Sequence, residues 1–279
     1  MIPLNIGRNS SFWGKWSDGF RMIHQSTAVI GMTSKNHLSS SEWEARVNLA
    51  ACYRLCALNQ WDDLIYTHIS ARVPGVKNHY LINPFGLQFE EITASNLLVV
   101  NTDGQCVSDQ QNGRVNPTGF AIHGAIHKAR PDAHCVMHLH NTAGVAVSAQ
   151  QDGLLPLSQH AMRFQGHLGY HDYEGLALTA AEGIRLTQNL GKHPAMLLRN
   201  HGTLTVGRTV AEAYVVMATL IKACEIQVAA LSSPNCRWPS QEVIQKAANE
   251  LHDSGAEEGA LEWPALLRKL DRIDPSYKT

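Results

Sequence analysis

The stretch DAHCVMHLHNTAG, residues 132–144, contains an apolar run that carries two histidines one residue apart. His138 and His140 alternate with Met137 and Leu139, and a two-residue period of this kind predicts a β-strand. Side chains at positions i and i+2 of a strand project from the same face. The stretch therefore predicts a strand that presents two imidazoles side by side.

Two neighbouring imidazoles can bind one metal ion through ring nitrogens at about 2.0–2.1 Å. His201 is the best candidate for a third ligand, because it lies in a tight Asn-His-Gly connection between two expected strands, where Gly202 lets the backbone bend sharply. Three histidines would leave one coordination position open. The spacing alone also fits an exposed strand face or a buried, hydrogen-bonded pair of histidines, so both interpretations stay open at this point.

The residues before this strand predict helices and short strands. A Ser-x-x-Glu capping box at Ser41 begins a helical period that covers residues 41–60. Residues 64–107 change to a two-residue period, and their Asp-Gly turn predicts a hairpin. Residues 118–129 are helical again and end before a proline. Antiparallel strands are therefore expected beside helices.

The residues after the strand continue this alternation. Thr-x-x-Glu capping boxes at Thr179 and Thr209 begin two further helices. The expected elements are short helices over 143–149 and 157–164, a strand over 169–173, a helix over 179–191, two strands within 195–207 and a helix over 209–231.

These patterns divide the chain into three parts. Residues 1–40 are rich in serine, glycine and asparagine without a sustained period, which predicts an irregular N-terminal arm. Residues 41–234 form the predicted α/β domain. Residues 235–279, with a helical period over 240–253 and two later prolines, predict a C-terminal helical appendage.

The composition limits the classes of partner. The 279 residues include 23 Lys and Arg against 24 Asp and Glu, without a basic strip for a nucleic-acid backbone or an anionic membrane. No apolar run approaches the roughly 20 residues of a membrane span. The six cysteines form no Cys-x-x-Cys pair, which favours reduced thiols and a cytoplasmic protein. We therefore expect a small-molecule partner, and neither nucleic acid nor membrane.

Several longer stretches resemble one family in their order and spacing. ARPDAHCVMHLHNTAGVAVSA and MLLRNHGTLTVGRTVAEA are similar to the class II aldolase and adducin family, and YTHISARVPG, LINPFGLQFEEITASNLLVV, LLPLSQ and YHDYEG resemble its adducin-type, bacterial-like branch. The resemblance covers about residues 46–230. It implies a three-layer α/β/α domain with a mainly antiparallel central sheet, and a homotetramer with active sites between subunits. It also implies a divalent metal, typically zinc with manganese or cobalt as alternatives, on His138, His140 and His201.

The sequence departs from the sugar-phosphate aldolases of this family at several positions. Those enzymes carry a proton-transferring Glu nineteen residues before the first histidine of the pair, where this chain has Gly119. Their phosphate-binding elements correspond to Thr67-His68, Phe85-Gly86 and Pro117-Thr118, which lack most of the small donors that would hold a phosphate. These departures predict a non-phosphorylated substrate.

Other side chains must then move the proton. His160, next to the position of the aldolases' acidic tyrosine, and His171, in YHDYEG, are the predicted catalytic residues, because imidazole titrates near neutral pH. Glu174 is a candidate to orient a ligand imidazole or a plain loop charge. Arg199 is a candidate partner of a substrate carboxylate or of a subunit contact.

Two functions from different classes fit these residues. The first is a metal-dependent lyase, of aldolase or decarboxylase type, that acts on a small non-phosphorylated carbonyl or carboxylate compound. The second is an adducin-like, non-catalytic assembly or partner-binding protein with a structural metal site. The complete set of three histidines favours the lyase.

Overall fold

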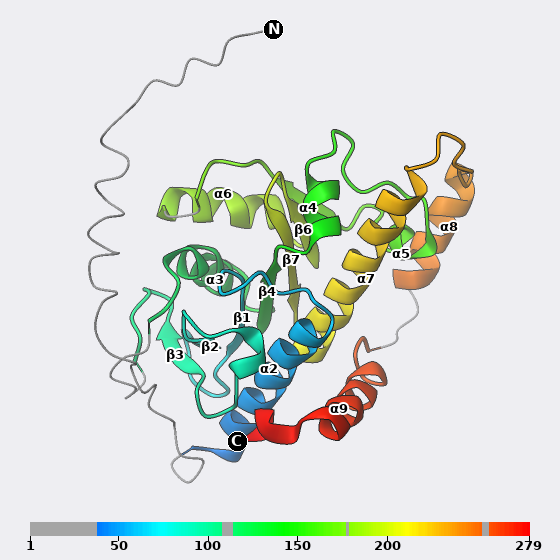
Figure 1. Ribbon diagram of the computed structural model, residues 1–279. Coiled ribbons are helices and arrows are strands. Elements are labelled where there is room, and N and C mark those ends of the chain that lie inside the picture. The colour runs from blue at the N-terminus through cyan, green and yellow to red at the C-terminus, as the bar shows by residue number, and fades with distance from the viewer. Residues whose placement is uncertain (1–37, 108–113, 177–178, 253–256) are drawn as a thin grey trace, which may run out of the picture.

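A computed structural model describes residues 38–107, 114–176, 179–252 and 257–279 of the chain. Within these ranges, one seven-stranded sheet lies between two layers of helices (Figure 1). The predicted three-layer α/β/α class is therefore confirmed. Nearly all of the predicted N-terminal arm, residues 1–40, lies outside the described residues.

The sheet places the strand of the histidine pair at its centre. Its order is β3-β2-β1-β4-β7-β6-β5, and every neighbouring pair is antiparallel except β5 with β6. The predicted mainly antiparallel sheet is thus confirmed. The strands are β1 (His68–Arg72), β2 (His79–Ile82), β3 (Leu98–Asn101), β4 (Cys135–Leu139), β5 (Leu168–His171), β6 (Ala195–Leu198) and β7 (Gly202–Gly207).

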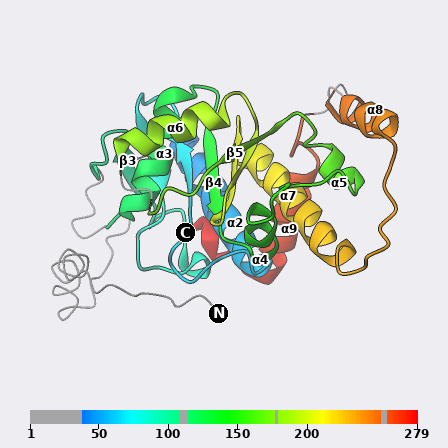
Figure 2. The ribbon, with the colours of Figure 1, turned by 90° about the horizontal axis from the view of Figure 1, so that it is seen from above.

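Helices cover both faces of the sheet. Figure 2 shows α3 and α6 on one side, and α2, α4, α7 and α9 on the other. The helices are α2 (Ser40–Leu58), α3 (Pro117–Ala129), α4 (Thr142–Ser148), α5 (Gln159–Met162), α6 (Ala180–Leu190), α7 (Val210–Ala230), α8 (Gln241–His252) and α9 (Glu262–Ile273). Short 3-10 helices are η2 (Phe89–Glu91) and η3 (Pro275–Lys278).

Successive side chains of β4 point alternately into the hydrophobic cores on the two faces of the sheet. Val136 packs with Ile122 and Leu186 of the α3 and α6 layer, whereas Met137 and Leu139 pack in the core beneath α2 and α7. Each such side chain, when fully buried, contributes about 1.5–3 kcal/mol to stability. His138, two residues after Val136, consequently faces the α3 layer.

The start of α2 differs from the predicted capping box at Ser41. The N-cap is Ser39, whose Oγ accepts a hydrogen bond from the Glu42 backbone N–H at 3.1 Å. Three consecutive serines offer several possible N-cap positions, and a tertiary contact of the first turns of α2 selects Ser39. Glu42 pairs at 2.9 Å with Arg46, whose buried guanidinium also donates to the carbonyl of Leu97.

The predicted hairpin within residues 64–107 is shorter than expected. Its second strand is reduced to an isolated bridge between Val100 and Cys106. The side-chain oxygen of Asn101 accepts hydrogen bonds from the N–H groups of Asp103 and Gln105 and so closes the turn locally. A further backbone hydrogen bond, from the Val107 N–H to the Val99 carbonyl at 2.9 Å, extends the pairing.

The end of the predicted appendage, residues 235–279, packs into the main core. Tyr277 is fully buried, and its carbonyl accepts a hydrogen bond from the Ala94 N–H at 2.9 Å. Trp263 of α9 also lies in the core beneath α2 and α7. The predicted domain boundaries remain a prediction, but α9 and η3 share the core of the domain.

Helix α7 is long and apolar enough, by length and composition, to cross a membrane. In the structure it packs against the sheet, with Met217 and Leu220 fully buried. Half of its most apolar window is buried within the molecule, as expected of a core helix.

Candidate metal centre

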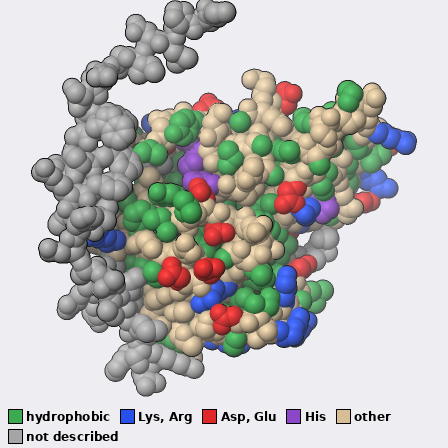
Figure 3. All heavy atoms as spheres, in the orientation of Figure 1, with side chains coloured by type: hydrophobic (Ala, Val, Ile, Leu, Met, Phe, Trp, Pro, Cys, Tyr) green, Lys and Arg blue, Asp and Glu red, His purple; other side chains and the backbone are tan. Residues whose placement is uncertain are grey.

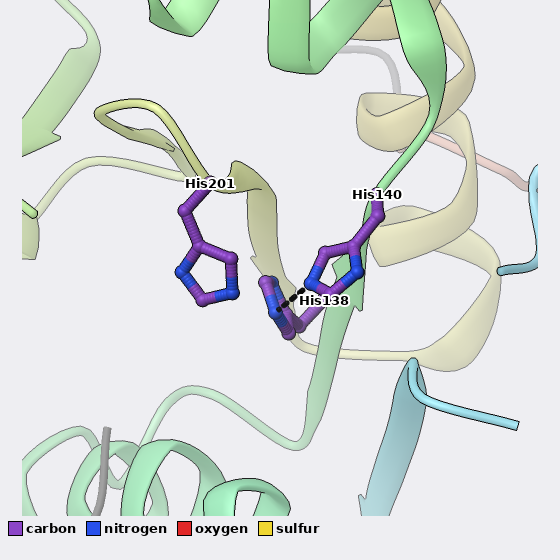
Figure 4. Close-up of side chains that lie close together, drawn as sticks. All are labelled: His138, His140 and His201. Atoms are coloured by element: carbon purple, nitrogen blue, oxygen red, sulfur yellow. Dashed lines mark hydrogen bonds between the residues drawn. The ribbon is translucent and has the colours of Figure 1, made fainter. Parts of the chain in front are cut away.

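Three histidines from distant parts of the chain meet at one end of the central strands (Figure 4). His138 lies in β4, His140 directly follows it, and His201 lies in the turn between β6 and β7. Their ring centroids are 4.7, 4.8 and 4.9 Å apart, and one nitrogen from each ring lies within 4.8 Å of the others. The structure therefore brings together the three predicted ligands.

Backbone conformation in the β6–β7 turn places His201. Asn200 has φ of 56°, a left-handed conformation that asparagine tolerates better than most residues. A Cβ on Gly202 would lie 2.5 Å from the Leu139 carbonyl oxygen and 3.1 Å from the His140 ring. Glycine is thus required for the close approach of this turn to the end of β4.

Hydrogen bonds at Nδ1 fix the orientation of two of the rings. His138 Nδ1 donates to the Thr203 carbonyl at 3.1 Å, and His140 Nδ1 donates to Asp63 at 3.0 Å. A neutral ring that donates through Nδ1 carries its lone pair on Nε2. A carbonyl or carboxylate partner of this kind orients metal-binding histidines in many proteins. Asp63 could not be predicted as a partner from the sequence, because no local pattern links it to His140.

The two Nε2 atoms provide a test of whether a cation fits. They lie 3.1 Å apart and face each other (Figure 4). Two lone pairs at this distance repel each other unless a cation or proton lies between them. Nitrogens that bind one ion at ~2.0–2.1 Å lie about 3 Å apart at common coordination angles. The donor set and its spacing therefore fit a divalent metal.

The surroundings keep two rings of the cluster, those of His138 and His201, neutral. Burial lowers the pKa of His138 well below its ordinary value, and the neighbouring His201, His140 and His68 lower it further. Burial, with smaller contributions from His140 and His171, lowers the pKa of His201 to about 4. Near neutral pH the imidazoles of His138 and His201 therefore carry the free lone pairs that a metal requires.

A fourth histidine occupies the space beside Gly119. A Cβ on Gly119 would lie 2.9 Å from Cδ2 of His68, so the position where the aldolases carry Glu is covered by this ring. His68 is paired with His138 across β1 and β4, and the two ring centroids are 5.2 Å apart. This place of His68 beside Gly119 was not predicted from the sequence. The alternation of His68 with Ser70 in YTHISARV was the available signal.

The two predicted catalytic histidines lie in different surroundings. His171, at the end of β5, is 5% exposed, and Asn189 donates to its Nδ1 at 3.0 Å. Its carbonyl accepts a hydrogen bond from the Arg199 N–H at 2.8 Å, so the end of β5 lies beside the turn that carries His201. His160 is exposed on α5, a helix that packs against α7 and α8. The structure thus brings His171, but not His160, near the cluster of the same chain; the catalytic role of each stays a prediction.

The two other candidates have partners within the chain. Glu174 binds Arg185 through both carboxylate oxygens, and its Oε1 lies 4.0 Å from His171 Nε2 rather than beside a cluster histidine. Arg199 donates to the Gln150 carbonyl at 2.7 Å and lies over the Tyr170 ring. Arg199 therefore positions a loop of its own chain.

The fold and site together are a mainly antiparallel α/β/α sheet with three histidines that could hold a metal ion at one end of its central strands. Residues 47–228 match the model of the Class II Aldolase and Adducin N-terminal domain. The chain belongs to this family, as the sequence resemblance predicted.

Relatives named as aldolases and relatives named as adducins are both similar to the chain. A Caulobacter vibrioides protein, provisionally named an aldolase class 2 protein, is 49% identical over 252 residues, covering 90% of this chain and 98% of that protein. Alpha-adducin of Rattus norvegicus is 42% identical over 251 residues, covering 84% of this chain and 34% of alpha-adducin. The chain therefore spans about a third of the length of that adducin.

Solved structures share the fold. An aldolase II superfamily protein from Pseudomonas syringae has a TM-score of 0.85 and 48% identity, covering 88% of this chain and 99% of that one. L-fuculose 1-phosphate aldolase from Glaciozyma antarctica has a TM-score of 0.74 and 29% identity, covering 85% of this chain and 93% of that one.

Proposed function

We propose that this protein is a metal-dependent carbon–carbon lyase, of aldolase or decarboxylase type, that acts on a small non-phosphorylated carbonyl or carboxylate compound. The observation that carries the proposal is the cluster of His138, His140 and His201, with two Nε2 atoms 3.1 Å apart and two rings oriented at Nδ1. Three protein ligands leave room for a substrate oxygen at a metal.

Zinc is the proposed ion, with manganese or cobalt as alternatives, because imidazole suits all three. When bound, a divalent cation acts as a Lewis acid that polarises a carbonyl or carboxylate oxygen. The Thr203 carbonyl and Asp63 hold the rings of His138 and His140 in the required tautomer. His171 is the proposed proton carrier: because Asn189 donates to Nδ1, the neutral ring carries its proton on Nε2.

The beginning of α3 supports a substrate without phosphate. The side-chain oxygen of Asn116 accepts hydrogen bonds from both the backbone N–H and the hydroxyl of Thr118, at 3.1 and 2.8 Å. A free helix N-terminus commonly binds phosphate through such N–H groups. Here the chain's own cap already uses donors that a phosphate would need.

The adducin-like alternative has its own support. The 42% identity with alpha-adducin favours a partner-binding protein in which a metal at the cluster would be structural. In either case we propose a cytoplasmic protein, and for the lyase a small-molecule substrate.

Metal analysis of the purified protein tests the proposal first. We expect about one divalent ion per chain, and its loss in His138→Ala or His201→Ala, because removal of one of three protein ligands weakens binding by orders of magnitude. Plasma emission spectrometry on chelator-free protein measures the content. His134→Ala is the matched control, because His134 is exposed and four residues before His138. No bound metal, and no uptake of added zinc, manganese or cobalt, would contradict the site.

A substrate screen then separates the two functions. Hydroxy-acids and keto-acids are incubated with metal-loaded protein and assayed for released pyruvate, aldehyde or carbon dioxide. We expect release that a chelator abolishes and zinc restores. If wild-type protein binds metal and no compound reacts, the adducin-like function becomes the better one.

A further inference from the structure

A buried chain of hydrogen bonds runs from the candidate metal centre into the α3 layer. His68 Nδ1 lies 2.8 Å from His123 Nε2, and Ser70 Oγ contacts both His123 Nδ1 and, at 2.7 Å, His127 Nε2. His127 Nδ1 lies 3.1 Å from the Ala133 carbonyl oxygen. All four side chains are buried.

The carbonyl at the end of this chain fixes the proton on every ring. A carbonyl only accepts, so His127 Nδ1 donates to Ala133 and its Nε2 accepts from the Ser70 hydroxyl. Ser70 Oγ then accepts from His123 Nδ1. The remaining His123 Nε2 can only accept, so His68 Nδ1 donates to it. His68 is left with an unprotonated Nε2.

This assignment requires neutral rings, which their burial provides. Desolvation lowers the pKa of His127 to about 3 and that of His123 well below its ordinary value. With each ring neutral, one nitrogen donates and the other accepts, so the direction of the whole chain is determined.

The His68 ring, with its unprotonated Nε2, lies beside the candidate metal centre. The ring lies beside His138, and the Cβ position of Gly119 is 3.2 Å from His68 Nε2 and 2.9 Å from the adjacent Cδ2. Among the described residues, Nε2 has no hydrogen-bond partner in the protein. His68 is also outside the group of nitrogens within 4.8 Å of one another, which consists of His138, His140 and His201.

We propose that His68 Nε2 is a fixed hydrogen-bond acceptor for a hydroxyl group of the compound bound at the three-histidine cluster. The inference rests on the proposed function and narrows its substrate class. An acceptor selects a hydroxy-acid or hydroxy-carbonyl compound, because a keto oxygen would place two lone pairs against each other. Ser70, His123 and His127 are positioning residues that keep His68 in this tautomer.

The tautomer can be tested without any substrate. ¹⁵N NMR of histidine-labelled protein distinguishes protonated from bare ring nitrogens, and the His68→Gln variant assigns the His68 signals. We expect His68 to have a protonated Nδ1 and a bare Nε2, both before and after zinc is added. A protonated Nε2 overturns the proposal, and so does a zinc-induced shift of Nε2, because it would make His68 a metal ligand.

A matched pair of Ser70 variants tests the buried chain of hydrogen bonds. Ser70→Ala removes the hydroxyl that links His123 to His127, and we expect the His68 signals to show a mixture of tautomers. Ser70→Thr keeps a hydroxyl and is expected to keep the bare Nε2. An unchanged tautomer in a folded Ser70→Ala variant overturns the positioning role of the chain.

Binding tests the acceptor itself on zinc-loaded protein, with lactate and pyruvate as probes in titration calorimetry. We expect His68→Ala to keep its zinc and to bind lactate about tenfold more weakly, the effect of one hydrogen bond, with little change for pyruvate. Wild-type protein without a preference for lactate overturns the inference. Lactate preference without turnover of any compound would instead contradict the lyase, and leave the acceptor role intact.

Discussion

At His138, His171 and His68, a hydrogen bond at Nδ1 determines what Nε2 can offer. The Thr203 carbonyl engages His138 at Nδ1, so Nε2 is available to a metal. Asn189 donates to His171 at Nδ1, which leaves an N–H at Nε2, whereas His68 is left with a lone pair. Imidazole side chains are thus proposed for three different roles: ligand, donor and acceptor.

The donor role of His171 predicts a loss of turnover that is separate from metal loss. In an active lyase, we expect His171→Ala to lower kcat about 100-fold or more, as for a missing general acid or base, while bound metal stays unchanged. Steady-state kinetics with metal analysis measures both. His160→Ala is expected to match it only if a neighbouring subunit brings His160 to the cluster. Full activity in both variants would show that another group carries the proton.

The buried histidines also predict that stability depends on pH. Burial lowers the pKa of His127 from 6.5 to about 3, so between these values the unfolded chain binds a proton that the folded protein does not. The free energy of unfolding therefore falls as the pH falls through this window, by up to about 1.4 kcal/mol per pH unit for this group.

Urea denaturation at about pH 7.5 and about pH 5 measures this dependence. We expect the His127→Gln variant to show a smaller difference between the two conditions than wild type. The exposed His134→Ala is the control and should keep the full difference. Equal differences in His127→Gln and wild type would show that His127 does not titrate on unfolding.

At the scale of elements, η3 is short but joins several parts of the fold. The Tyr277 hydroxyl donates to Asp271 of α9 at 2.7 Å, and the carbonyl accepts from the segment before β3. Asp274, at the start of η3, pairs with Arg54 of α2 at 3.0 Å. The element thus ties α9 to α2 over a buried aromatic ring.

This packing predicts a large effect of one substitution near the end of the described chain. Tyr277→Ala is expected to lower the free energy of unfolding by about 3–5 kcal/mol, because it removes a fully buried aromatic ring. Tyr66→Ala is the matched control; with 51% of Tyr66 exposed, the change should be about 0.5 kcal/mol or less. Urea denaturation measures both. Similarly small changes in the free energy of unfolding of both variants would mean that η3 does not belong to the cooperative core.

At the scale of the molecule, apolar side chains are exposed where α7 ends and α8 begins. Leu231, Trp238 and Val243 are 40%, 51% and 52% exposed. Helix α8 projects from this end of the molecule in Figure 1. Figure 3 shows histidine side chains reaching the surface on the face that is turned to the viewer. The exposed apolar side chains suit contacts with further copies of the chain.

We predict a homotetramer, the state that the family resemblance implies. Light scattering coupled to gel filtration should give a mass about four times that of the 30.7 kDa chain. The mass of one chain at micromolar concentration would contradict the prediction and would exclude a role for His160 from a neighbouring subunit.

Elements whose signals are local could be predicted from the amino-acid sequence. The period of β4 placed His138 and His140 on one face, and the capping boxes at Thr179 and Thr209 matched helices whose caps accept from Glu N–H groups at 3.2 and 3.0 Å. Such patterns can be recognised in the sequence because the interacting residues lie within one turn or one strand.

Which distant residues lie at the site depends on how the chain folds as a whole. Asp63 orients His140 across 77 positions of sequence, and His68 fills the space over Gly119 because β1 pairs with β4 beneath α3. No local periodicity in the sequence predicts such contacts. They follow from the strand order, which is selected by the burial of both faces of the sheet and by the pairing of its backbone hydrogen bonds.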